Sequence, residues 1–236
     1  MADTNRLTLP LLAAAQAQKH VTVNEALTRL DGLVQLVLLS VGQSAPPLSA
    51  PDGSCYGVPA GASGDWAAHD GQIAIASGGG WVFATPAQGW RAYIRDQAAD
   101  ALFDGSQWQV GGIAASPDGA AVVMEVAQVD HVIGAGTTSN VAAALPANSI
   151  VYGVTGRVIT AISGSLGSFR LGVAGSDNRY GAGLGLAQGS WLRGLTGSPL
   201  TYYSDEDLLL SAEGGDFAGG TIRLAVHLMR LTLPSA

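Results

Sequence analysis

Apolar and polar positions alternate most regularly between residues 18 and 41. Apolar residues recur there at i, i+3, i+4 and i+7, which is the spacing of one face of an amphipathic helix. They are Leu27, Leu30, Leu33, Val34, Val37, Leu38 and Val41. Thr22 and Glu25 have the spacing of a capping box at a helix N-terminus. Gly42 and the two prolines that follow predict the C-terminal end, so we expect one long helix.

Residues 1–17 precede this helix and read as an arm in which leucines surround Pro10. An arm of this kind reaches over a neighbour or pairs with a strand; the alternative is a frayed terminus. For the helix itself, the pattern alone favours packing against one side of its own domain. The other interpretation is a docking helix that packs against sister subunits or a larger assembly.

Short β segments separated by glycine turns follow the helix. We predict strands at 54–58, 72–76, 81–84, 90–94 and 107–110, with Asp-Gly pairs as hairpin signals. Trp66, Trp81, Trp90 and Trp108 are irregularly spaced within this block, which favours a core over an exposed aromatic platform. The block predicts a small meander or barrel.

The rest of the chain contains strand patterns and no convincing helix. The predicted strands are 122–132, 150–162, 169–174, 180–186, 200–203, 207–212 and 221–233. Regular spacing and glycine-rich turns favour an antiparallel sandwich of jelly-roll type. We therefore expect a mainly β protein in three parts: an arm and docking helix (1–44), a small tryptophan-rich β module (45–115) and a β-sandwich (116–236).

Composition narrows the function. Charged residues make up only 12% of the chain and the net charge is −7, which argues against nucleic-acid binding. Cys55 is the single cysteine and the four histidines lie far apart, so we expect no metal site and no cofactor. No secretion signal or membrane-spanning run is recognisable, which predicts a protein that is made and kept in the cytoplasm, or that leaves by lysis as part of a particle.

The most site-like region is 176–205, where aromatic and planar polar side chains occur among glycines and serines. Aromatic faces and planar polar groups are the residue types that bind sugars. The candidate glycan-binding residues are Asp177, Asn178, Arg179, Tyr180, Trp191, Arg193, Tyr202, Tyr203 and Asp205. The structural alternative is that Trp191 and one tyrosine belong to the core, while Asp177 and Asn178 form a turn.

Catalytic chemistry has weaker support. Asp205, Glu206 and Asp207 are the densest acidic cluster, and a carboxylate pair across a groove can hydrolyse a glycosidic bond. Adjacent residues on a strand point to opposite faces, however, so a charged turn is favoured. We assign no catalytic residues and expect the protein not to be an enzyme.

Several motifs between residues 7 and 110 resemble an uncharacterised family of phage and gene-transfer-agent proteins. They are Gln18-Lys19-His20-Val21-Thr22, Asn24-Glu25-Ala26-Leu27, Leu30-Asp31, Pro46-Pro47, Asp52-Gly53, Tyr56-x-Val58, Gly61-Ala62-x-Gly64-x-Trp66, Gln72-Ile73-Ala74, Trp81-x-Phe83, Pro86-x-x-Gly89-Trp90 and Trp108. Members resemble head-spike proteins of alphaproteobacterial gene transfer agents and tryptophan-rich modules of tail fibres.

The resemblance implies a structural protein on the surface of a phage-like particle that binds host capsular polysaccharide. It favours the docking interpretation of the helix, with Leu27, Leu30, Val34, Val37, Leu38 and Val41 contacting sister subunits or the capsid. The expected partners are copies of the chain, forming a pentamer at a capsid vertex or a trimer in a fibre, together with a capsid or fibre protein. Alternatives are a spike enzyme that modifies capsule, or a connecting base that carries a separate fibre.

Overall fold

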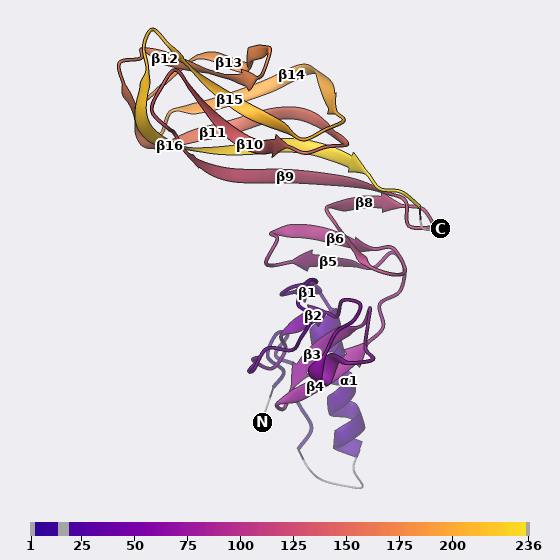
Figure 1. Cartoon of the computed structure of the whole chain (residues 1–236). Coiled ribbons are helices and arrows are strands. Elements are labelled where there is room, and N and C mark those ends of the chain that lie inside the picture. The colour runs from indigo at the N-terminus through magenta and orange to yellow at the C-terminus, as the bar shows by residue number, and fades with distance from the viewer. Residues whose placement is uncertain (1–2, 14–18, 235–236) are drawn as a thin grey trace. The chain divides into compact units, whose positions relative to one another are not determined.

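The computed structural model describes residues 3–13 and 19–234, and it confirms a mainly β fold with an N-terminal helix. Contacts divide the chain into two units (Figure 1). The first unit contains Met1–Ala121 and Thr232–Ala236, and the second contains Val122–Leu231. The helix and the small β module thus share one unit, whereas the sequence predicts separate parts.

Among its described residues, the first unit contains one α-helix, one 3-10 helix and two small sheets. Its elements are α1 (Lys19–Leu33), β1 (Val37–Leu38), β2 (Cys55–Gly57), the 3-10 helix η1 (Gly64–Trp66), β3 (Ile73–Ser77), β4 (Gly80–Ala84), β5 (Arg91–Ile94), β6 (Ala99–Phe103), β7 (Trp108–Val110) and β8 (Gly112–Ala115). Strands β2, β3 and β4 form an antiparallel meander. The second sheet has the order β1-β5-β6-β7, with β1 parallel to β5.

Aromatic packing holds the meander together, as the sequence predicts. The Trp66 side chain is fully buried, and its ring lies 5.3 Å from the ring of Tyr56 and 5.2 Å from that of Trp81. Tilted and edge-to-face contacts of this kind stabilise by about 0.5–1.5 kcal/mol each beyond the burial of area. The four tryptophans of this unit pack in or against its core rather than forming a platform.

The helix is shorter than the sequence predicts. It ends at Leu33, Gln35 takes a left-handed φ of 51°, and the chain then enters β1. Gly32 and Asp31 are weak helix formers, and burial of Leu36 and Leu38 in the core of the unit outweighs continued helical period. Thr22 lies inside α1 rather than at its N-cap, so the helix begins before the predicted capping box; Gln18, where the periodic stretch starts, is outside the described residues.

The described part of the arm folds back onto α1 of the same chain. The buried Asp31 carboxylate accepts hydrogen bonds from the Thr4 hydroxyl at 2.7 Å and from the Leu7 amide at 2.6 Å. The Arg6 guanidinium donates to the carbonyls of Asp31 and Gly32, at 3.2 and 2.7 Å. It therefore caps the C-terminal end of α1, where carbonyls lack partners within the helix. Residues 14–17 of the predicted arm lie outside the described residues.

The second unit is a sandwich of two antiparallel sheets. Its strands are β9 (Ala121–Val132), β10 (Thr138–Leu145), β11 (Ser149–Gly164), β12 (Ser168–Val173), β13 (Ser176–Leu184), β14 (Trp191–Tyr202), β15 (Glu206–Glu213) and β16 (Phe217–Leu231). One sheet has the order β10-β15-β12-β13, and the long strands of the other lie in the order β14-β11-β16-β9. Valine, leucine and phenylalanine side chains from both sheets fill one core.

Candidate functional site

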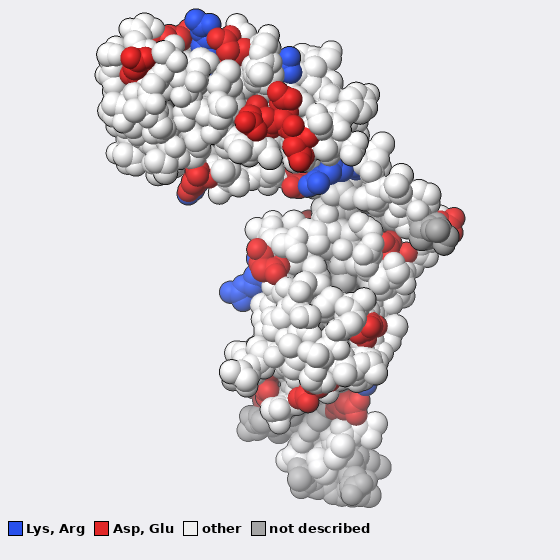
Figure 2. All heavy atoms as spheres, viewed as in Figure 1, with Lys and Arg blue, Asp and Glu red and all other residues white. Residues whose placement is uncertain are grey.

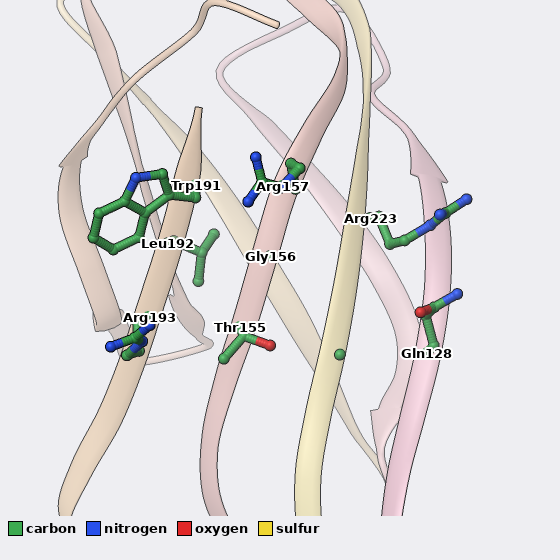
Figure 3. A pocket seen from close by; sticks show the side chains of 9 residues that line it. Gln128, Thr155, Gly156, Arg157, Trp191, Leu192, Arg193 and Arg223 are labelled. Carbon is green, nitrogen blue, oxygen red and sulfur yellow. The ribbon is translucent and has the colours of Figure 1, made fainter. Parts of the chain in front are cut away.

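A groove of about 320 Å³ lies on the sheet formed by β14, β11, β16 and β9. Figure 3 shows the residues that line it, which come from all four strands. They are Gln128, Thr155, Gly156, Arg157, Trp191, Leu192, Arg193, Arg223 and Ala225. All of these residues belong to the second unit.

Strand register places the lining residues in two rows across the sheet. In the first row, Arg157 lies directly opposite Trp191 on one side and opposite Arg223 on the other. In the second row, Thr155 pairs in the same way with Arg193 and Ala225. Neighbouring strands are about 4.8 Å apart, so three residues in a row span about 10 Å, the length of one or two sugar rings.

The alternation of the strands explains why these side chains face outward. Leu192 and Leu224 are buried in the sandwich core, and Trp191, Arg193 and Arg223 occupy the alternate positions beside them. Gly156 fits between the layers because a β-carbon there would meet Leu224 and Leu192 side-chain carbons at 2.8 and 3.1 Å. Core packing thus fixes the outer face on which the groove forms.

Trp191 is the aromatic member of the groove, and 65% of its surface is exposed. The guanidinium carbon of Arg193 lies 5.9 Å from the Trp191 ring centroid, within the range of a cation–π contact. A large exposed indole that is held beside a cation offers a flat apolar face next to planar hydrogen-bond donors. That combination suits a sugar ring, whose C–H groups pack on the indole and whose hydroxyls accept from the guanidinium.

The charge of the groove is positive, in contrast to the net charge of −7. Figure 2 shows that most of the visible surface is uncharged, with acidic and basic side chains in small separate groups. Arg223 is neutralised by Asp130, whose oxygens accept from Nε and a terminal nitrogen at 2.6 Å each. These bonds lower the pKa of Asp130. Arg157 and Arg193 form no ion pair with any residue in the described ranges.

Only some of the predicted glycan-binding residues line the groove. Trp191 and Arg193 lie in the groove, and Trp191 is not a core residue. Tyr180 and Tyr202 are buried instead, with their hydroxyls 2.8 Å apart, which rules out direct contact with a glycan. Burial and the hydrogen bond with Tyr202 raise the pKa of Tyr180. Two tyrosines thus belong to the core. The structural alternative in the sequence analysis places only one tyrosine there, together with Trp191.

The remaining candidates lie outside the groove. Asp177 on β13 forms an ion pair with Arg170 at 2.9 Å, and the Arg179 guanidinium donates to the Tyr202 hydroxyl at 3.1 Å. Asn178 is exposed on β13, and Tyr203 is 82% exposed beyond the end of β14. None of these side chains lines the groove with Trp191.

Two carboxylates of the acidic cluster bind backbone amides. The Asp205 carboxylate accepts from the Ala147 amide at 2.8 Å, and the Asp207 carboxylate accepts from the Ala143 amide at 2.9 Å. Asp205 therefore holds the turn between β10 and β11, and Asp207 binds β10 where its pairing with β15 is irregular. This arrangement supports the charged-turn interpretation over an acid–base pair.

Sequence reasoning missed Gln128, Thr155, Arg157 and Arg223. Each lies at an outward-facing position of a strand, so the alternation of inward and outward residues is the only local signal that could have identified it. Their grouping with Trp191 depends on long-range strand pairing, which no local pattern carries. Within the described residues, no group of histidine, cysteine and acidic side chains could hold a metal ion.

The six predicted docking residues differ in how far their side chains are buried. Leu38 is fully buried in the core of its own unit, so its prediction as a docking residue is wrong, and Val41 packs against the same core. Val37 and Leu27 are half-buried. Leu30 and Val34 remain 48% and 38% exposed. Burial within β1 and its neighbours accounts for the difference, because β1 replaces the last turns of the predicted helix.

An apolar stripe, exposed except at the half-buried Leu27, nevertheless follows α1. Its members are Val23, Leu27, Leu30 and Val34, with the Val34 amide still donating to the Leu30 carbonyl at 3.0 Å. Their spacing of four, three and four residues is that of the a and d positions of a coiled coil. We call these four residues the α1 stripe.

The other side of α1 holds the helix to its own unit through polar contacts. The Asn24 amide group exchanges hydrogen bonds with the backbone of Leu12, at 2.9 and 3.0 Å. The Arg29 guanidinium donates to the Phe83 carbonyl at 2.7 Å. A helix that uses polar contacts inward and leaves its apolar stripe exposed has the reverse of the usual surface-helix arrangement. Among the described residues, no helix has the length and apolar character needed to cross a membrane.

Comparison with known proteins gives one family match. Residues 23–109 match the family described as "Protein of unknown function (DUF2793)". The match lies within the range 7–110 in which the sequence motifs occur, and it covers less than half of the chain. No curated protein matches.

Three chains of solved structures match the protein. One comes from a structure titled "Cyanophage Pam1 capsid asymmetric unit". The likeness covers 50% of this chain and 92% of that chain, with 25% sequence identity and a TM-score of 0.33. A TM-score this low carries no argument about fold or function.

Proposed function

We propose that the protein is a structural spike or fibre-base protein on the surface of a phage-like gene transfer agent particle, where it binds host capsular polysaccharide. The observation that carries the binding role is the exposed Trp191 indole beside Arg193 in an open groove. The particle assignment is supported by the motifs between residues 7 and 110. It also accords with the family match to residues 23–109, although that family has no established function.

Assembly uses the α1 stripe, and the occupant is a second copy of the chain. The a and d spacing of the stripe is self-complementary, because each apolar side chain of one helix fits between side chains of an identical helix. An exposed stripe of this kind suits a closed ring of subunits, fivefold at a capsid vertex or threefold in a fibre. The first unit then attaches the protein to the particle, and the second unit binds the host polysaccharide.

The test compares binding of the full-length protein to encapsulated cells and to capsule-free cells of the same strain. We expect binding only to encapsulated cells, and we expect Trp191→Ala to lower it at least about tenfold, because stacking on an aromatic ring is lost. Tyr203→Ala is the matched control, since Tyr203 is exposed and aromatic but lies outside the groove. Equal binding to both kinds of cell would leave the protein as a connecting base that carries a separate fibre.

A further inference from the structure

We propose that the groove of the second unit selects saccharides whose rings carry a carboxylate, such as hexuronic acids. This inference rests on the carbohydrate-binding role proposed above and adds the chemical class of the ligand. Its basis is the position of two guanidinium groups near Trp191: Arg193 lies two residues further along β14 with its guanidinium over the indole ring, and Arg157 lies opposite Trp191 on β11.

The two guanidinium groups are free to bind an anion. Other arginines are used within the fold: Arg170 bonds Glu213 and Asp177, Arg223 bonds Asp130, and Arg230 bonds Glu125. Arg157 has only a hydrogen bond to the Gly189 carbonyl at 3.3 Å, and Arg193 has its contact with the Trp191 ring. No acidic side chain lines the groove. The groove is therefore a local excess of positive charge in an acidic protein.

The geometry favours a carboxylate that is attached directly to a sugar ring. The backbones of Arg157 and Trp191 are paired on neighbouring strands, about 5 Å apart, and both side chains are exposed. A hexuronic acid carries its carboxylate on a ring carbon, so a ring that stacks on the indole holds the carboxylate beside β11, where the long Arg157 side chain extends from the sheet. The planar guanidinium fork donates to both carboxylate oxygens at once, a bidentate contact that a neutral hydroxymethyl group cannot form.

The far end of the groove supplies neutral polar groups. The Gln128 amide lies on β9, across Ala225 from Thr155. Figure 3 shows Gln128 and Thr155 on the same face as Trp191 and the arginines. An amide that both donates and accepts suits the hydroxyls of a second sugar unit. The groove thus has an apolar and cationic end for an acidic sugar, followed by a neutral polar end.

The experiment measures binding of the full-length protein to two trisaccharides by titration calorimetry, at low and high salt. The probes are the α-1,4 trisaccharide of galacturonic acid and the matching trisaccharide of galactose, which differ only in the carboxylate. We expect the galacturonate probe to bind about tenfold more tightly, and we expect this preference to shrink as salt rises. Arg157→Gln with Arg193→Gln should abolish the preference. Arg95→Gln, on the exposed surface of the first unit, should leave it unchanged.

The outcomes separate this inference from the function on which it rests. If both trisaccharides bind equally and the Arg157→Gln, Arg193→Gln double variant matches the native protein, the charge selectivity is wrong. Loss of that binding in Trp191→Ala would then leave the adhesive role intact. If neither trisaccharide binds and encapsulated cells are still bound through Trp191, the carboxylate assignment is likewise overturned. Failure to bind encapsulated cells would overturn the proposed function itself.

Discussion

Arg157 on β11 lies directly opposite Trp191 on β14, and both side chains face out of the sandwich. The pair places a cation and a flat apolar surface side by side on a rigid sheet. Sites built on strands hold their side chains more precisely than sites built on loops. This relationship forms the centre of the proposed binding groove.

The ion pair between Arg223 and Asp130 limits the positive charge of the groove. We expect Asp130→Asn to release the Arg223 guanidinium and to tighten binding of the galacturonate trisaccharide about two- to fivefold, the range for an exposed charge pair. Titration calorimetry measures the change. Asp65→Asn, an exposed position in the first unit, is the control for overall charge. Unchanged or weaker binding in Asp130→Asn would show that Arg223 does not act on the ligand.

The α1 stripe predicts self-association. Leu30→Asp with Val34→Asp places two charges at the positions where identical helices meet, so the assembly should separate into single chains of 23.8 kDa. Sedimentation equilibrium measures the mass. Val21→Asp is the matched control, because Val21 is also apolar and 56% exposed but lies away from the stripe on α1. A native protein that sediments at 23.8 kDa at micromolar concentration would contradict assembly through this stripe.

The paired tyrosines predict a role in stability rather than in binding. Tyr202→Phe leaves the buried Tyr180 hydroxyl without its partner at 2.8 Å, which should lower the free energy of unfolding by about 1–2 kcal/mol. Urea denaturation measures the loss, and affinity for the saccharide should stay unchanged. Tyr203→Phe, at the neighbouring exposed position, should change neither quantity. Reduced affinity in Tyr202→Phe without reduced stability would restore Tyr202 to the binding site.

Asp31 holds the arm on α1. Asp31→Ala removes a buried acceptor of hydrogen bonds from the Thr4 hydroxyl and from the Leu7 and Arg6 amides. We expect a loss of about 2–4 kcal/mol in unfolding free energy, because these donors lose their partner. Hydrogen exchange at the Leu7 and Leu9 amides should rise in the same variant. Exchange that stays at the native rate would show that other contacts hold the arm.

Glu213 predicts a pH dependence in the second unit. Its carboxylate accepts from the Ser168 hydroxyl at 2.6 Å, from Arg170 at 2.8 Å and from the Gly183 amide at 2.9 Å. These bonds lower the pKa of Glu213 from 4.5 to about 2. A lowered pKa in the folded state means that the ionised Glu213 carboxylate stabilises the fold. Its contribution to the free energy of unfolding is therefore complete above pH 4.5 and is lost as the pH falls toward 2.

The measurement for Glu213 compares the native protein with Glu213→Gln by urea denaturation across this range. The difference in stability between the two proteins should be constant above pH 4.5 and should disappear near pH 2. A difference that persists unchanged at the lowest pH would mean that the ionised carboxylate does not stabilise the fold.

The fold class follows from sequence because strand alternation and glycine turns are local signals. They locate most long strands of the second unit, such as β9 and β16. Strand β10 was missed, since its alanines have low β propensity and tertiary pairing with β15 decides its conformation. The sequence predicts the end of α1 at Gly42 because apolar residues beyond Leu33 continue a helical period. In the structure Leu36 and Leu38 are instead buried beside and within strand β1.

The site was only half predictable. Trp191 and Arg193 are predicted by residue type alone, because the sequence places no strand before residue 200 there; their shared face comes from β14, which begins at Trp191. In the sequence, nothing distinguishes Tyr180 and Tyr202 from tyrosines on the surface. Only the folded structure shows that their hydroxyls form a hydrogen bond with each other. Arg157 and Arg223 enter the groove through cross-strand register, which is set by the packing of whole sheets.

A crystal structure of the full-length protein with the galacturonate trisaccharide bound would locate the saccharide site itself. We expect a sugar ring stacked on the Trp191 indole, with its carboxylate within hydrogen-bond distance of the Arg157 or Arg193 guanidinium. A saccharide bound elsewhere on the chain, or an empty groove at saturating ligand concentration, would contradict this expectation.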